Sequence, residues 1–297
     1  MTFLAIVLMC IIWGLTWVAI KIGLEDLPPL LSAGVRFVLA CALLWPVVFW
    51  RRLSLPRKWP EIRTILVPGF FIYGVNYALV YWGEQYIGAG LAAILFASLP
   101  FLVALFAHYL LPGEKMTLVK LTGLSCGFLG IVLVFHGGLS FGPDSYLGML
   151  ALLGSSLSAA YANILVKRDL HDIDPMLATA VQMSLGAVLL LGLGTATESW
   201  QDFHLTRKAV GTLLYLSVFG SALAFSLYFW ALKKTEATKL SLIAFVTPLV
   251  ALVGGNLILN EPITGRLAAG SILVLVGILV VNYFSYPGKN QAGAQKS

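Results

Sequence analysis

The sequence predicts an all-α integral membrane protein with ten transmembrane helices, arranged as two inverted five-helix repeats. Its 297 residues are 59% apolar and only 11% charged, whereas about 25% of residues are charged in soluble proteins. Ten apolar stretches of roughly 20 residues are each long enough to cross ~30 Å of hydrocarbon as a helix. One pattern of Trp, Pro, Glu and Gly residues also recurs in the second half of the chain.

The five predicted helices of the first half follow one another with short connections. The first, over 3–22, has neither a basic n-region nor a small-residue cleavage site, so we expect a retained helix and not a cleaved signal peptide. Pro28-Pro29 leads into the second, over 29–50, and a basic connection at 51–58 follows it. Long apolar runs predict the remaining three helices, over 62–86, 88–111 and 116–136.

The second half has the same number of apolar runs. Lys167-Arg168 closes the sixth helix, and Lys233-Lys234 follows the eighth. The five helices are predicted over 146–167, 175–196, 208–232, 237–259 and 264–284. The last residues, 287–297, are polar, and we expect a disordered tail.

The basic residues predict the orientation in the membrane, because Lys and Arg resist translocation. Fourteen of them lie in loops on one side, and four lie on the other side: Lys21, Arg207, Lys208 and Arg266. We therefore expect a multi-pass protein of the inner (plasma) membrane with both termini in the cytoplasm. The scattered basic residues form no stripe, so nucleic acid is not an expected partner.

The two halves superimpose when the chain is shifted by about 147 residues. We expect one repeat over 1–140 and a second over 141–286. Each repeat has five spans, an odd number, so the second enters the membrane from the opposite side. Inverted repeats are a recurring architecture of secondary transporters, with the solute site where the repeats meet. The matching pairs are Lys21 and Lys167, Asp26 and Asp172, Pro29 and Pro175, Trp82 and Trp230, Pro100 and Pro248, Glu114 and Glu261, Gly123 and Gly270, and Gly130 and Gly277.

These residues resemble the drug/metabolite transporter superfamily in its ten-helix EamA branch. The resemblance covers nearly the whole chain, and it implies a central cavity and export of amino acids or related small metabolites. The sequence departs from internal symmetry at Ala159-Ala160, where the first helix has Trp13-Gly14. The residues that carry the resemblance are Trp13-Gly14, Pro28-Pro29, Arg36-Phe37, Pro100, Gly113-Glu114, Pro248, Glu261, Gly270 and Gly277.

Polar and aromatic residues within the first repeat predict a substrate-binding wall. Their spacing of three and four residues places Tyr73, Asn76, Tyr77 and Tyr81 on one face of the third helix. Phenol and amide groups facing lipid would lack partners, so we expect this face to line a cavity. Trp13 and Trp17 are expected to add an aromatic face from the first helix.

Arg36 is the clearest ionisable group within a span. It lies about 10 Å inside the end of the second helix, at 1.5 Å per residue. Two interpretations remain open. The guanidinium either snorkels to the headgroups as an anchor or holds a substrate carboxylate.

The second repeat supplies further candidates. Tyr161, Asn163 and Gln182 are uncharged polar residues inside predicted helices, where hydrogen bonding between helices is an alternative to solute contact. Phe225 and Tyr228 give the eighth helix an aromatic segment that matches the third. Pro100 and Pro248 occupy corresponding mid-span positions, and we expect hinges there because proline kinks a helix.

Several function classes are excluded by absence. The sequence has no HExxH motif, no Walker-type loop and no clustered Cys and His, so we expect no enzyme, no metal site and no cofactor. No Asp or Glu lies at mid-span, which argues against the carboxylate-based cation exchange of small multidrug pumps. We expect a secondary transporter that exports amino acids or related neutral or zwitterionic metabolites by alternating access, as a monomer or weak homodimer. The alternatives are a nucleotide-sugar or phosphate-ester carrier and a non-transporting membrane scaffold, and proton coupling and facilitated export both remain open.

Overall fold

The computed structural model describes residues 2–112, 116–137, 143–232 and 242–283, and every regular element in these ranges is a helix. Seven of the described helical stretches are long and apolar enough to cross a membrane. Three shorter apolar helices cover Leu118–Val134, Val246–Leu259 and Gly265–Val281. The all-helical membrane fold is therefore confirmed. The predicted tail at 287–297 and the first residues of the span at 237–259 lie outside the described residues.

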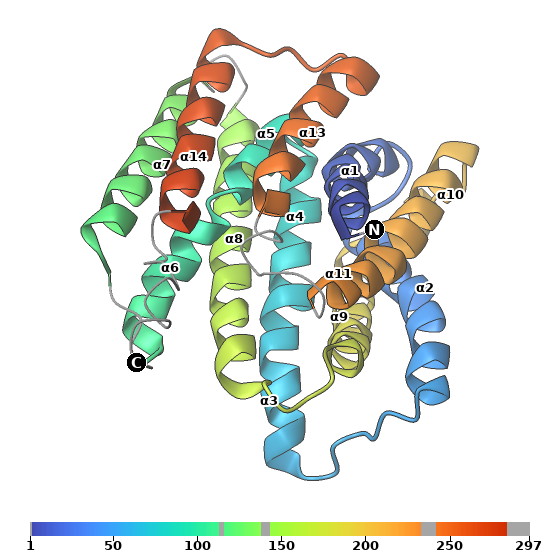
Figure 1. Cartoon of the computed structure of the whole chain (residues 1–297). Coiled ribbons are helices and arrows are strands. Elements are labelled where there is room, and N and C mark those ends of the chain that lie inside the picture. Colours follow the sequence, from blue (N-terminus) through green and yellow to red (C-terminus); the bar gives the residue numbers. More distant parts are fainter. Residues whose placement is uncertain (1, 113–115, 138–142, 233–241, 284–297) are drawn as a thin grey trace, which may run out of the picture.

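The described helices follow the predicted order along the chain (Figure 1). In the first half they are α1 (Thr2–Gly23), α2 (Pro29–Trp50), α3 (Trp59–Gly69), η1 (Phe70–Val75), α4 (Asn76–Glu84), α5 (Ala89–Phe96), α6 (Leu99–Leu110) and α7 (Leu118–Gly137). In the second half they are α8 (Pro143–Asp169), α9 (Pro175–Thr197), η3 (Trp200–Asp202), α10 (Arg207–Leu214), η4 (Tyr215–Leu223), α11 (Ala224–Leu232), α13 (Leu242–Leu259) and α14 (Gly265–Tyr283).

Two predicted α-helices each contain a π-helical segment. The helix predicted over 62–86 begins at Trp59 and widens into η1, and the helix predicted over 208–232 widens into η4. A π-helical turn is closed by i→i+5 hydrogen bonds, such as the one from Asn76 N to Phe71 O. Within η1, Phe71 O accepts a hydrogen bond from Ser158 Oγ of α8 at 2.7 Å. The two π segments lie at corresponding places in the two halves.

The helix predicted over 88–111 forms two helices, because the α-helical hydrogen bonding is interrupted between α5 and α6. Pro100 lies in the first turn of α6, and its missing N–H leaves Phe96 O without its helical donor. Ser156 Oγ of α8 donates to this carbonyl at 3.3 Å. Pro248, by contrast, lies inside a continuous α13. The backbone is thus interrupted at one of the two predicted hinges and regular at the other.

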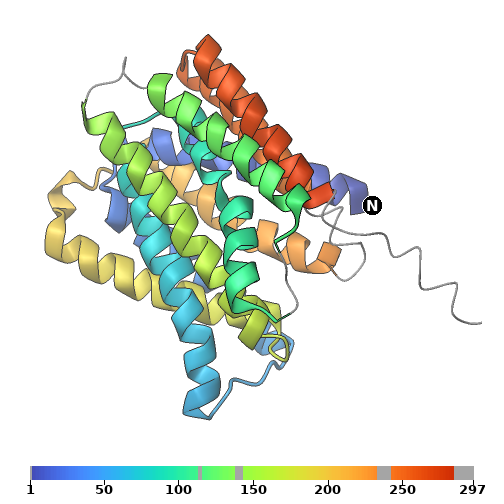
Figure 2. The same cartoon turned by 90° about the vertical axis from the view of Figure 1, so that its left-hand side faces the viewer.

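Each principal helix contact has a counterpart in the other half of the chain. α7 packs along α14 in both views (Figures 1 and 2), and α2 packs along α9. α1 packs on α13, as α8 packs on α5 and α6. α4 packs on α8, as η4 and α11 pack on α1. Exchanging the two halves therefore reproduces these principal contacts, whereas the contacts of α1 with α5 and of α14 with α6 have no counterpart of similar extent among the described residues.

Glycines allow α7 and α14 to approach closely. A Cβ on Gly277 would lie 2.6 Å from Gly123 O and 2.6 Å from Gly127 N, and a Cβ on Gly130 would lie 2.6 Å from Gly270 O. Backbone atoms cannot move aside as a flexible side chain can, so a larger residue would force the two helices apart. The glycines thus give both helices small faces that allow close packing.

The bundle has two ends, which we call the Lys21 end and the Arg51 end after residues near the ends of α1 and α2. At the Lys21 end, Lys208 Nζ lies 3.1 Å from Glu25 Oε2 across the two halves. At the Arg51 end, an Arg51 guanidinium nitrogen lies 3.2 Å from Asp174 Oδ2, again across the halves. Both pairs are partly exposed, so each contributes little to stability by itself.

A carboxylate from the second half caps α2. Pro29 starts this helix, where a missing N–H costs nothing. The next two N–H groups, of Leu30 and Leu31, donate to Oε1 and Oε2 of Glu198 at 2.9 Å each. A negative charge at a helix N-terminus also meets the positive end of the helix dipole. The Lys21 end of α2 is therefore held by the other half of the chain.

Candidate functional site

Aromatic side chains from both halves form one continuous set of ring contacts inside the bundle. The centroids of Tyr73, Tyr77 and Tyr81 follow one another along η1 and α4 at 6.0 and 6.4 Å. Phe225 of α11 lies 6.4 Å from Tyr73 and 5.6 Å from Trp13 of α1. The predicted face of the third helix is thus directed at the second half of the chain. We call this set the aromatic cluster: Trp13, Phe37, Tyr73, Tyr77, Tyr81, Phe225 and Tyr228.

A polar side chain, that of Asn76, lies beside this cluster and is bound to the π segment η1. Asn76 Nδ2 donates to Ile72 O of η1 at 3.0 Å. Asn76 Oδ1 is buried and has no hydrogen-bond partner among the described residues. A buried amide oxygen without a donor costs free energy, so it marks a place where a ligand or water would be stabilised.

Arg36 lies within the bundle and does not reach its surface. Only 2% of the residue is exposed, which excludes the snorkelling interpretation. Nε donates to Ser221 Oγ and Nη1 to Tyr81 Oη, both at 3.2 Å. The guanidinium carbon also lies 5.2 Å from the centroid of the Tyr77 ring, a cation–π distance.

All of these partners of Arg36 are neutral. No carboxylate of the described residues lies within ion-pair distance of the guanidinium. The two hydrogen bonds use a minority of its five N–H donors. A buried cation without a counter-ion is costly, so this site favours an anionic group of a bound solute.

Apart from Arg36 and Asn76, which lie beside the aromatic cluster, four further predicted binding residues are not part of it. Trp17 packs on Phe96 with 5.3 Å between ring centroids. Tyr161 packs between Phe71 and Phe106 at 5.0 and 5.9 Å. Gln182 Nε2 donates to Ile65 O at 3.2 Å, and this bond joins α9 to α3. Asn163 is half-buried on α8 and makes no side-chain hydrogen bond to another described residue.

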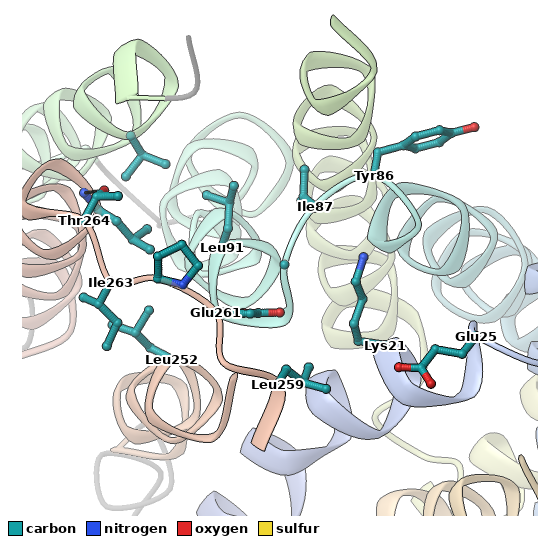
Figure 3. Close-up of a pocket in the computed structure, with 14 residues that line it drawn as sticks. Lys21, Glu25, Tyr86, Ile87, Leu91, Leu252, Leu259, Glu261, Ile263 and Thr264 are labelled. Atoms are coloured by element: carbon teal, nitrogen blue, oxygen red, sulfur yellow. Dashed lines mark hydrogen bonds between the residues drawn. The ribbon is translucent and has the colours of Figure 1, made fainter. Parts of the chain in front are cut away.

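A pocket of about 380 Å³ opens at the Lys21 end (Figure 3). Lys21 and Glu25 come from α1 and the turn that follows it, and Glu261 from the connection between α13 and α14. Tyr86 and Ile87, between α4 and α5, cover another side. Most of the remaining wall is apolar, and it includes Leu91, Val134, Leu252, Leu259, Pro262, Ile263 and Leu267.

Charged groups of this pocket hold the connection between α4 and α5 from both sides. Glu261 accepts hydrogen bonds from the first two N–H groups of α5, at 2.7 Å from Ala89 N and 3.0 Å from Gly90 N. Lys21 Nζ donates to Glu84 O at 2.5 Å and to the next carbonyl at 3.2 Å. Figure 3 shows both side chains directed at this connection. Glu261 therefore caps the N-terminus of α5, and Lys21 caps the C-terminus of α4, beside the pocket.

The sequence interpretation missed several residues around these sites. Phe37 joins the cluster at 4.7 Å from the Tyr77 ring, and Ser221 binds Arg36. Glu261 entered the sequence argument only through the repeat and the family resemblance, and not as a residue of a site. The available signal was the position of Lys21 and Glu84 at the ends of apolar helices, where opposite charges can meet. Among the described residues no group of three His, Cys, Asp or Glu could hold a metal ion.

Comparison with known proteins gives consistent matches over nearly the full chain. The sequence profile of the EamA-like transporter family matches residues 1–136 and again residues 146–283. The chain is 30% identical over 285 residues to the uncharacterized transporter YoaV of Bacillus subtilis, covering 95% of this chain and 97% of that protein. It is 33% identical over 283 residues to the uncharacterized transporter YvbV of the same organism, covering 95% and 91%.

Two further matches extend this result. The uncharacterized inner membrane transporter YedA of Escherichia coli K12 is 30% identical over 285 residues, covering 94% of this chain and 90% of that protein. One solved crystal structure superimposes with a TM-score of 0.69 at 18% identity, covering 97% of this chain and 99% of the other. At that identity the superposition shows a shared fold only.

Proposed function

Because the chain belongs to the EamA-like transporter family, we propose that it exports amino acids or related small zwitterionic metabolites by alternating access. The family and the names of its relatives identify a multi-pass membrane transporter and not an enzyme. The proposal concerns the solute, the direction and the mechanism. It includes ten spans in two inverted repeats, over 1–140 and 141–286, with both termini in the cytoplasm.

One observation carries the solute class: Arg36 is buried and has only neutral partners. A solute carboxylate would supply the missing negative charge, and a guanidinium can bind it with two parallel hydrogen bonds. The neighbouring tyrosine faces suit an ammonium group or an apolar side chain. Together these groups match the two ends of an amino acid.

Alternating access is supported by the helix contacts that recur in the two halves. Each principal contact in one half has a counterpart in the other, and the aromatic cluster lies where the halves meet. In inverted-repeat transporters the two halves exchange conformations around such a site, and this opens it to one side and then to the other. At the Lys21 end, Glu198 and Glu261 reach across the halves.

Counterflow in proteoliposomes tests the solute class. Vesicles loaded with one unlabelled amino acid are diluted into a trace of the same labelled amino acid, using alanine, threonine, methionine, phenylalanine and tryptophan in turn. We expect saturable accumulation of at least one of them, and none in protein-free vesicles. Accumulation of a nucleotide sugar or phosphate ester with none of the five amino acids would replace this proposal with the carrier alternative.

A further inference from the structure

Glu84 is a fully buried acid near the Lys21 end of the bundle. It is the last residue of α4, and its exposure is 0%. Neither carboxylate oxygen has a hydrogen-bond partner among the described residues. The ammonium group of Lys21 bonds to the backbone carbonyl of Glu84 and not to its carboxylate. The carboxyl group of Glu84 therefore takes no part in the hydrogen bonds of its described neighbours.

The charged groups that act electrostatically on Glu84 come from three different elements. They are Lys21 of α1, Arg36 of α2, and Glu261 between α13 and α14. The face of α8 that packs beside Gly83 carries Gly148, Ala151 and Leu152 and no charge. α5 has no ionisable residue, and Tyr81 on α4 itself donates no hydrogen bond to the acid among the described residues.

Glu84 also lies between the two sites already described. One turn before it on α4, Tyr81 binds Arg36 at the edge of the aromatic cluster. Two residues after it, Tyr86 lines the pocket at the Lys21 end. Lys21, which lines the same pocket, bonds to the Glu84 backbone. The acid is thus within one helical turn of the aromatic cluster and two residues from Tyr86, which lines the pocket at the Lys21 end.

An ionised carboxylate in this position would have lost its water without gaining a hydrogen bond, and this is strongly unfavourable. A protonated carboxyl group is neutral and avoids that cost. We propose that Glu84 is the proton-binding site of this transporter, carrying a proton when it is buried and exchanging it with water when the Lys21 end opens. This inference rests on the proposed transport function, to which it adds a coupling ion.

The proton balance follows from the positions of the groups. With the Lys21 end open, the Glu84 carboxylate contacts water in the pocket and exchanges its proton there. In the structure described here, Glu84 is buried from this pocket, and the protonated acid lies beside Lys21 and the aromatic cluster. Opening of the other side would expose the same proton to the opposite compartment. One proton would then cross for each cycle in which the acid is loaded on one side and discharged on the other.

Infrared spectroscopy of the purified protein in lipid nanodiscs tests the protonation without any solute. A protonated carboxylic acid has a C=O stretching band that an ionised carboxylate lacks. We expect such a band in the wild-type protein at neutral pH and its loss in Glu84→Gln. The matched control is Glu61→Gln, which removes an exposed acid from the other end of the same helical stretch, Trp59–Glu84. It should leave the band unchanged.

Proton flux tests the coupling. Wild-type proteoliposomes that contain a pH-sensitive dye are exposed to each of the five amino acids named above. We expect the amino acid that shows counterflow to change the internal pH, and this change to be lost in Glu84→Gln and retained in Glu61→Gln. Glu84→Asp keeps a titratable carboxyl group, so it should retain the flux with a shifted pH profile.

The outcomes separate the two proposals. If the wild-type protein has no band at neutral pH, or if the band and the flux persist in Glu84→Gln, the proton site is wrong. Counterflow without any proton flux in the wild type would overturn the coupling and leave the proposed transport intact. If no amino acid is transported, the solute class fails, while the infrared result still decides whether Glu84 binds a proton. If Glu84→Gln does not fold, absence of the band from the wild-type spectrum still overturns the proposal, and a shift of the band in Glu84→Asp still supports it.

Discussion

Arg36 combines a permanent positive charge with a wholly neutral set of neighbours. Arg36→Ala should weaken solute binding by at least ~2 kcal/mol, about a 30-fold rise in the half-saturation concentration. Arg36→Lys keeps the charge but loses the planar fork, so its loss should be smaller. The measurement is the concentration dependence of amino-acid counterflow for both variants.

The matched control for Arg36 is Arg57→Ala, which removes an exposed arginine near the Arg51 end. It should transport like the wild type. Equal and near-wild-type kinetics in Arg36→Ala and Arg36→Lys would show that the buried charge is structural. The solute carboxylate would then have to be placed elsewhere.

Asn76 and Tyr77 test the neutral part of the same wall. Asn76→Ala removes the unpartnered amide oxygen, and Tyr77→Ala removes the ring beneath the Arg36 guanidinium. We expect both variants to be inserted in normal amounts and to transport more slowly, because a solute would lose a polar contact or a stacking surface. Gln201→Ala, at an exposed position in η3, is the control. Normal kinetics in both cluster variants would remove η1 and α4 from the site.

The tyrosine face could be predicted because the spacing of residues along a helix fixes which of them share a face. The burial of Glu84 could not be predicted in the same way. It lies at the end of a helix, and how deeply such a residue is buried depends on which other helices cover that end. Here α1 and α8 do so, and no sequence pattern specifies their approach. Lys21 and Glu261 were missed as wall residues for the same reason.

At the scale of elements, the close packing of α7 on α14 depends on glycines at the contact between the two helices. Gly277→Ala would place a Cβ 2.6 Å from backbone atoms of Gly123 and Gly127. Overpacking of this kind costs roughly 1–3 kcal/mol, so the melting temperature of the detergent-solubilised protein should fall by several degrees.

Gly192 of α9 provides the matched control, because a Cβ there would meet no atom within 4 Å. Gly192→Ala should leave the melting temperature unchanged or raise it slightly, since alanine is the better helix former. If both alanine variants melted alike, close packing at Gly277 would not be what holds α7 to α14.

Hydropathy located the helices well, because the length of an apolar run is set by the thickness of the membrane. Departures from regular α-helical geometry could not be predicted from hydropathy. The π segments η1 and η4 and the break before Pro100 alter backbone bonding without altering hydropathy. Proline signalled the break at α5 and α6, yet α13 continues through Pro248. Which proline interrupts its helix depends on neighbours such as Ser156, which bonds to the carbonyl left free.

At the scale of the whole molecule, cross-half bonds accumulate at the Lys21 end. Glu198 holds α2 and Glu261 holds α5, each through two backbone N–H groups. Lys208 adds an exposed contact to Glu25. Opening this end would break these bonds together and expose the acid beside Lys21 to water. The same movement would thus control both the solute pathway and the proton on Glu84.

The inverted arrangement makes a definite prediction about sidedness. Four predicted spans separate Arg57 from His171, so these residues should lie on the same face of the membrane, whereas one span separates His171 from Asp202. All three positions are exposed and serve as single-cysteine sites once Cys10, Cys41 and Cys126 are replaced by alanine. In intact cells, a membrane-impermeant thiol reagent should label Asp202→Cys, while Arg57→Cys and His171→Cys should react only after permeabilisation. Labelling of Arg57→Cys and His171→Cys from opposite faces would mean an odd number of crossings between them, and the two halves could then not be related by inversion.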